Sequence, residues 1–126
     1  MLRFILAATL ALCGLLHTIS GVHAQAFPAK SVRLIVPWPP GGSADIVGRL
    51  LAMELQSRWG QAIVIENRGG ASGNIGMELA ARSPADGYTL GCGQGGNMVI
   101  VPLAYAKVAY DSRKDFTPMA MMASNF

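Results

Sequence analysis

Three glycine-rich segments constrain the fold of this chain more than any other feature of its sequence. They lie at residues 37–42, 68–73 and 93–97. Each follows a short apolar run and precedes a stretch with helical spacing, so we expect strands at 31–36, 62–66 and 88–92 and helices at 44–59, 74–82 and 98–105. Such strand–loop–helix units are typical of an α/β fold with a largely parallel sheet and right-handed crossovers.

Several residues mark the ends of these elements. Ser43 is a suitable N-cap for the first helix, and Gly60 suits the position just beyond its C-terminus. We expect the third helix to be interrupted near Pro102. A polar connection at 111–115 then leads to a further expected strand at 116–123.

The glycines indicate a binding site at one edge of the sheet. All three loops follow strands, so in a parallel sheet they meet at the carboxyl ends, where open α/β sheets bind ligands. Glycine lets the backbone approach a ligand, and free N–H groups at helix N-termini favour an anion. The alternative is that the glycines only form tight turns.

The first 24 residues have the pattern of a secretory signal peptide. Met1–Arg3 carries a positive charge, Phe4–Leu16 is almost entirely apolar, and Val22 and Ala24 are acceptable to a signal peptidase. The apolar run is shorter than the roughly 20 residues of a spanning helix. We expect cleavage after Ala24 and export to the periplasm, the alternatives being an uncleaved anchor or a buried N-terminal helix.

Removal of residues 1–24 changes the available chemistry. Of 126 residues, 102 remain, with no histidine and with Cys92 as the one cysteine. An intramolecular disulfide and the usual zinc or haem ligand sets are then excluded, and we expect neither a metal nor a cofactor. Loss of Arg3 leaves nine basic against seven acidic residues, spread along the chain, which does not indicate nucleic-acid binding.

Two other kinds of site are less well supported. Residues 91–96 match G-x-G-x-x-G, but the acidic Asp115 precedes the next expected strand instead of following it, and no G-x-x-x-x-G-K-[ST] motif is present. Without histidine there is no Ser-His-Asp or Cys-His pair. Asp45 and Glu66 could in principle act as acid and base, although an acid in the first turn of a helix more often complements its dipole. Cys92 is more often a small buried side chain than a nucleophile.

The sequence therefore favours ligand binding without catalysis. A dinucleotide-binding α/β enzyme domain is the alternative. Trp38 could line a pocket or pack beside the neighbouring prolines, and the sequence does not separate these.

The order of several motifs resembles the Bug, or TctC-type, periplasmic solute-binding proteins of tripartite tricarboxylate transporters. The similarity covers nearly all of the chain beyond the leader. The segments that carry it are Ile35–Asp45, Val64–Arg68, Gly70–Gly76, Pro84–Leu90, Tyr110–Asp111 and Asp115–Phe116.

The resemblance implies a Venus-flytrap fold, in which two α/β lobes hold a small carboxylate, partly through water. The loop positions carried over are Gly41, Gly42, Ser43 and Asp45, then Gly70, Ala71, Ser72 and Gly73. Backbone N–H groups and the hydroxyls of Ser43 or Ser72 would donate to the carboxylate. Asp45 would shape its loop or meet a polar or cationic part of the ligand. The implied partners are the carboxylate and the membrane components of the transporter.

The third loop departs from the family pattern. The family usually has small hydroxyl residues and then a threonine-histidine pair, whereas this chain has Gln94 and Asn97 in the matching stretch. Val101 stands where the family tends to have asparagine. Gln94 and Asn97 are therefore candidate binding residues whose contacts would help to determine the ligand.

The resemblance also gives an expectation about domains. Residues 25–126 would form the N-terminal α/β lobe of a two-lobed receptor, incomplete and truncated near the hinge. A cleft with one wall predicts weak or absent ligand binding by the chain as written. A nonfunctional gene remnant is a further alternative that the residues do not separate from a fragment.

Overall fold

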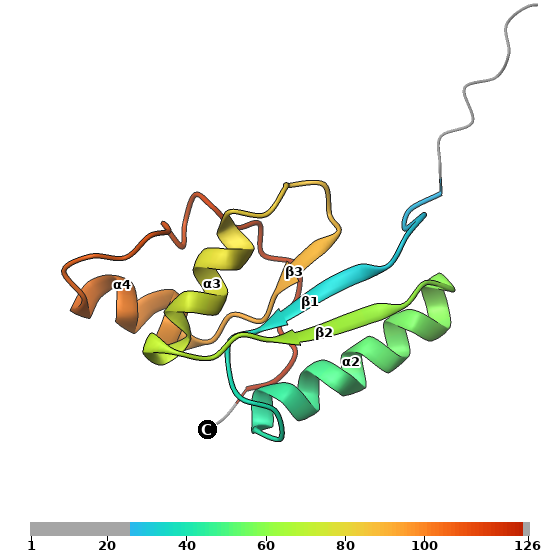
Figure 1. Ribbon diagram of the computed structural model, residues 1–126, viewed down its shortest axis with the longest axis horizontal. Helices are drawn as coiled ribbons and strands as arrows, with labels where there is room; N and C mark the ends of the chain where they lie inside the picture. Colours follow the sequence, from blue (N-terminus) through green and yellow to red (C-terminus); the bar gives the residue numbers. More distant parts are fainter. Residues whose placement is uncertain (1–25, 125–126) are drawn as a thin grey trace, which may run out of the picture.

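The computed structural model describes residues 26–124, which form a parallel three-stranded sheet covered by helices (Figure 1). The strands are β1 (Val32–Val36), β2 (Ile63–Asn67) and β3 (Thr89–Gly91), in the order β2-β1-β3. Helix α2 (Ser43–Trp59) connects β1 to β2, and α3 (Asn74–Ala81) connects β2 to β3. The predicted α/β architecture with a parallel sheet is confirmed.

The central strand β1 is buried on both faces. Val32, Leu34 and Val36 belong to the cluster that packs under α2. Ile35 points to the other face, where Met77 of α3 is 1% exposed. Because side chains alternate along a strand, α2 and α3 cover opposite faces of the sheet, as Figure 1 shows.

Helix α2 packs on the sheet through small residues. Ala44, Gly48 and Ala52 are buried, whereas Ile46 and Leu50 are exposed. A Cβ added to Gly48 would lie 3.3 Å from Val36 Cγ2, so the helix approaches β1 closely. The helix predicted at 44–59 is therefore correct to within one residue, but its most buried positions are largely small residues.

The two predicted helix ends differ in outcome. Gly60 has φ of 65° and donates its N–H to the Gln56 carbonyl, which confirms the predicted C-terminal glycine. Ser43 as N-cap is wrong: Gly42 is the N-cap, with extended backbone angles, and Ser43 is the first helical residue. The Gly42 carbonyl accepts the Ile46 N–H at 3.0 Å, so the helix begins one residue earlier than expected.

The chain beyond β2 contains shorter elements. A 3₁₀ turn, η2 (Ala71–Gly73), precedes α3, and a π-helical turn, η3 (Gly96–Ile100), runs into α4 (Val101–Ala104). The third helix thus begins earlier than predicted, within the expected loop 93–97. It also continues through Pro102, which sits in the first turn of α4, where a missing N–H is tolerated.

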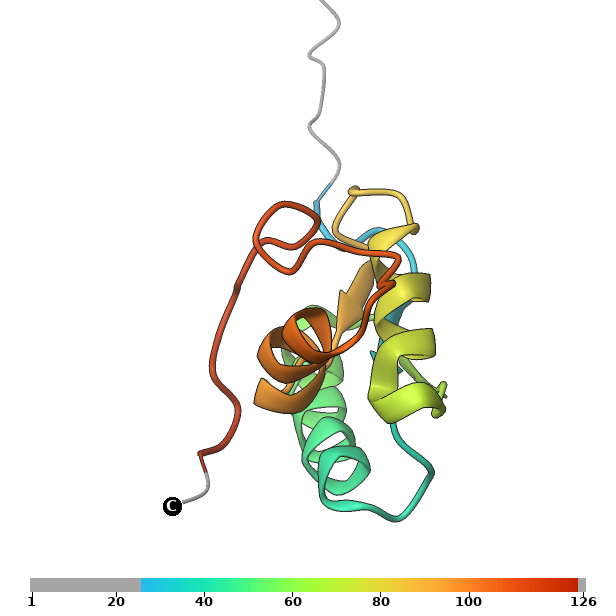
Figure 2. The same ribbon diagram turned by 90° about the vertical axis from the view of Figure 1, so that its left-hand side faces the viewer.

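The strand predicted at 116–123 is wrong for the described residues of that segment. It forms no element and runs back along the molecule after α4 (Figure 2). A strand needs a partner for its N–H and C=O groups, and Met119 and Met121 remain 74% and 84% exposed.

Two further points concern the ends of the chain and membranes. The predicted signal peptide at 1–24 lies outside the described residues. Within residues 26–124, no helix has the length and apolar character needed to cross a membrane.

Candidate functional site

A solvent-open hollow of about 470 Å³ lies at the carboxyl ends of β1 and β3. Its wall is formed by loop 1 (Pro37–Gly42) and the start of α2, together with Gln94 from the loop after β3. The lining residues are Trp38, Pro39, Pro40, Gly41, Gly42, Ser43, Ala44 and Gln94. In the order β2-β1-β3 the central strand β1 lies between the other two, and open α/β sheets bind ligands in the crevice outside the carboxyl ends of their strands.

The Asp45 carboxylate anchors loop 1 (Pro37–Gly42) by a hydrogen bond to its backbone. Its Oδ2 accepts the Gly41 N–H and Arg49 Nε, each at 2.9 Å, and its Oδ1 accepts Asn67 Nδ2 at 2.9 Å. The hydrogen bond from Arg49, then those from Gly41 and Asn67, hold the pKa of this carboxyl well below its usual range. Asp45 is 2% exposed, so its geometry fits the first of its two expected roles, shaping the loop.

The N-terminus of α2 presents donors to the hollow. Among residues 26–124, no hydrogen bond is donated by the N–H groups of Ser43 or Ala44, whereas the Gly41 N–H is occupied by Asp45. The positive end of the helix dipole lies at the same place, and no charged side chain lines the hollow.

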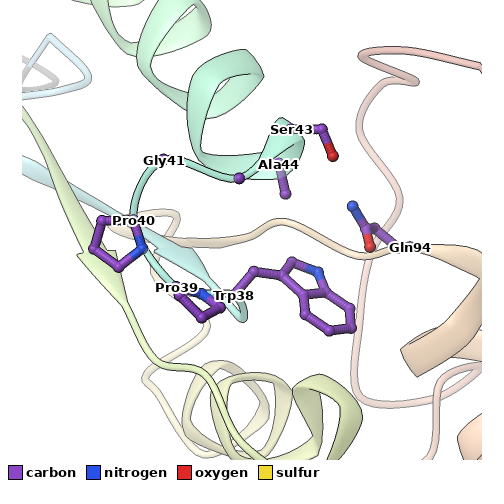
Figure 3. A pocket seen from close by; sticks show the side chains of 8 residues that line it. Trp38, Pro39, Pro40, Gly41, Ser43, Ala44 and Gln94 are labelled. Atoms are coloured by element: carbon purple, nitrogen blue, oxygen red, sulfur yellow. The ribbon is translucent and has the colours of Figure 1, made fainter.

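Two polar side chains face each other across this hollow. Figure 3 shows the Ser43 hydroxyl and the Gln94 amide pointing toward one another, with the Trp38 indole beside them. Trp38 lines the hollow, the first of its two expected positions, and it also packs against the core cluster. The hollow can therefore offer backbone N–H, hydroxyl and amide groups to a small anion.

Loop 2 (Arg68–Gly73) supports loop 1 instead of lining the hollow. Gly70, Ala71, Ser72 and Gly73 all have positive φ, from 46° at Ala71 to 120° at Gly70. A Cβ added to Gly73 would lie 2.9 Å from Asn97 Nδ2 and 3.4 Å from Pro37 Cβ. Ser72 is exposed, and its hydroxyl lies 3.5 Å from the Tyr105 hydroxyl.

Asn97 is a buried link within the third loop region. Its Oδ1 accepts the Gln94 N–H at 2.7 Å, and its carbonyl accepts the hydroxyl of Tyr110. Its Nδ2 is buried with no partner among the described residues. Asn97 is 0% exposed, so the structure places Gln94 on the wall of the hollow and Asn97 behind it.

The acid–base candidates weighed from sequence are engaged in other interactions. Glu66 Oε1 accepts Arg68 and Oε2 accepts Arg33, each at 2.7 Å, and these bonds hold its pKa below its usual range, Arg68 first. Burial raises the pKa of the Cys92 thiol, which is 3% exposed. The described residues contain no group of three or more side chains suited to a metal ion.

Comparison with known families identifies the group to which this site belongs. The model of the TctC family, the tripartite tricarboxylate transporter family receptor, matches residues 47–125. The chain belongs to the TctC family. This is a family of solute-binding receptors and not a class of enzymes.

Among curated TctC relatives, Protein BugT of Bordetella pertussis is 41% identical over 102 residues, which cover 80% of this chain and 31% of BugT. The chain spans about a third of the length of the curated relatives that it matches.

Solved structures of relatives share the TctC fold seen here. MatC from Rhodopseudomonas palustris with bound malate has a TM-score of 0.73 at 38% identity, covering 76% of this chain and 33% of MatC. A second R. palustris protein, with adipate, has a TM-score of 0.70 at 43% identity, covering 73% and 31%. Other solved relatives are periplasmic, the binding protein BugD among them.

One residue that contacts loop 1 in this TctC chain was not singled out from sequence. Asn67 ends β2, and its Nδ2 donates to both the Trp38 carbonyl and Asp45. Asn67 is a polar residue at the end of an apolar strand, and the neighbouring strand continues into a proline-rich loop. This combination is the sequence signal that could have indicated its role.

Proposed function

We propose that this chain supplies carboxylate-binding loops of a periplasmic receptor that delivers a small carboxylate to a tripartite tricarboxylate transporter. The observation that carries the proposal is the N-terminus of α2. Two backbone N–H groups without acceptors among the described residues, those of Ser43 and Ala44, border a hollow that no charged side chain lines. A carboxylate bound there would gain charge-assisted hydrogen bonds and the helix dipole.

The ten candidate residues divide by their contacts. Gly42, Ser43 and Gln94 would contact the carboxylate, with Trp38 as an additional wall. Gly41, Asp45 and Asn97 would act by holding these groups, because their polar atoms are engaged or buried. Gly70, Ala71, Ser72 and Gly73 would support loop 1, or reach a longer ligand from outside the hollow.

The relatives support the ligand class and the location. Malate and adipate, bound in two solved relatives, are small dicarboxylates, and the periplasmic relatives support the same compartment for this chain. The leader pattern at 1–24 is consistent with export. The membrane components of the transporter are the expected partners, as the family description implies.

A titration followed by NMR tests this function at the level of single amides. The ¹⁵N-labelled chain is titrated with malate and with adipate into the millimolar range, which also detects weak binding. We expect weak binding, in keeping with a cleft that has one wall, seen as saturable millimolar shifts of the Gly42, Ser43 and Ala44 amides. Adipamide, which has the length of adipate without its charge, serves as the control and should leave these amides unmoved.

Two results would refute the proposal. One is the absence of any shift at these three amides with both dicarboxylates. The other is an equal shift with adipamide, because the site would then not recognise the carboxylate charge.

A further inference from the structure

We propose that Asn67 is a positioning residue that sets the carboxylate affinity of the hollow through two hydrogen bonds to loop 1 and its anchor. The inference rests on the proposed function above. Asn67 lies outside the hollow and would contact no ligand.

The Asn67 amide connects β2 to both ends of loop 1. Asn67 is the last residue of β2 and pairs in register with Val36 of β1. Its Nδ2 donates to the Trp38 carbonyl at 3.1 Å and to Asp45 Oδ1 at 2.9 Å. Because Asp45 Oδ2 in turn accepts the Gly41 N–H, one amide group fixes the start of the loop directly and its end through Asp45.

Loop 1 is packed against loop 2 but forms few hydrogen bonds to the sheet. Pro37, Pro39 and Pro40 have no N–H, so they cannot donate to the sheet. The last backbone hydrogen bond between the β2 end and β1, just before loop 1 begins, runs from the Arg68 N–H to the Val36 carbonyl at 2.8 Å. Beyond that bond, the side chain of Asn67 takes the place of the missing sheet ladder.

Residue 67 must supply a hydrogen-bond donor, so a polar side chain that only accepts would not replace asparagine. Both oxygens that Nδ2 contacts are acceptors only: a carbonyl, and a carboxylate whose low pKa keeps it ionised. An aspartate at residue 67 would present lone pairs to both of them at nearly unchanged size. It would remove both hydrogen bonds together, leaving Asp45 bonded to Arg49 alone among side chains, and let the donors of α2 and loop 1 move relative to Gln94.

The experiment compares the wild-type chain with Asn67→Asp and Asn67→Ala in the titration with malate and adipate. Measurements are made at a temperature where each protein is folded. We expect both variants to bind at least about 10-fold more weakly, as loss of one hydrogen bond to a charged group implies. Without ligand, the Gly41 amide should also exchange faster with solvent, because its acceptor Asp45 loses one of its two side-chain donors and keeps only Arg49. Asn67→Ala adds no charge and keeps the test available if Asn67→Asp does not fold.

Val32→Ala is the matched control for stability alone. Val32 is fully buried at the amino end of β1, the opposite end of the strand from loop 1. This variant should lower the unfolding temperature and leave the affinity unchanged.

The outcomes separate this inference from the proposed function. If the wild type binds and the Asn67 variants lower only the unfolding temperature, as Val32→Ala does, the positioning role is refuted and the proposed function stands. If the wild type shifts no loop amide with either dicarboxylate, the proposed function fails and this inference fails with it.

Discussion

Replacement of Gly76 by alanine tests whether α3 and loop 1 approach as closely as the structure shows. Gly76 is buried in the first turn of α3, facing the start of loop 1. An added Cβ would lie 2.6 Å from the Arg68 carbonyl oxygen, 2.8 Å from Pro37 Cβ and 2.9 Å from Pro37 Cα. Two of these atoms belong to the backbone and the third to a rigid ring, so none can rotate away.

The expected loss of stability follows from two opposing effects. The shortest contact falls about 0.8 Å below an ordinary 3.4 Å contact, so α3 must move away from the sheet, where Met77 is 1% exposed. Such overpacking costs about 1–3 kcal/mol. The helix propensity of alanine over glycine returns up to about 1 kcal/mol. We therefore expect a net loss of about 0–2 kcal/mol in the free energy of unfolding, and a loss of about 1–3 kcal/mol relative to a glycine-to-alanine change that gains the same helix propensity without these contacts.

Urea unfolding followed by circular dichroism measures this difference, with Gly95→Ala as the matched control. Gly95 already has helical backbone angles, and a Cβ added there would meet nothing within 4 Å. The control should be neutral, or stabilised by about 0.4–1 kcal/mol. A Gly76→Ala chain as stable as Gly95→Ala would refute the reasoning, because helix propensity alone would then account for both variants.

Three further predictions concern single side chains. The pKa of Asp45 is lowered on folding, so its contribution to stability is complete above its ordinary pKa of 3.8 and is lost as the pH falls below that value. The urea midpoint of the wild type should therefore drop more between pH 6 and pH 3 than that of Asp45→Asn, and equal drops would contradict this. Tyr110→Phe leaves the buried Asn97 carbonyl without its hydroxyl donor and should cost about 1–2 kcal/mol by the same urea assay, whereas an unchanged midpoint would argue against that bond. Cys92 is buried and its pKa is raised, so in a Cys13→Ser background it should react with a disulfide reagent such as DTNB only in denaturant; rapid reaction of the native chain would show that the thiol is accessible.

The strands and long helices were predictable because local patterns determine them. The apolar, β-branched run of β1 predicts a buried strand, and Gly60 marks the end of α2 through its positive φ. The strand at 116–123 was wrong because its apolar pattern carries no information about a pairing partner. The apolar spacing of Val47, Leu51 and Leu55 predicts helix α2, but it does not reveal that the most buried positions are the small residues Ala44, Gly48 and Ala52.

The site was predictable in place and less so in detail. Parallel strands bring the loops to one edge whatever their side chains are, so Ser43 and Gln94 meet as expected from topology alone. The contacts of Asn67 depend on the distance from the end of β2 to the Trp38 carbonyl, which no sequence spacing encodes. Asn97 was expected beside the ligand, but its 0% exposure depends on the long-range approach of Tyr110 and Gly73.

The first two glycine-rich segments have different structural roles although both are rich in glycine. In loop 1, a Cβ on Gly41 would meet nothing within 4 Å, so glycine is favoured there by its positive φ of 84° and not by a close neighbour. The Gly41 N–H donates to Asp45 in this conformation. In loop 2, Gly73 serves contact, because any side chain would strike Asn97. A glycine that faces open space leaves room for a ligand, whereas one that faces a neighbour holds two loops together. The anion argument therefore applies to loop 1 and the start of α2, and the tight-turn alternative describes loop 2, which supports the site by packing.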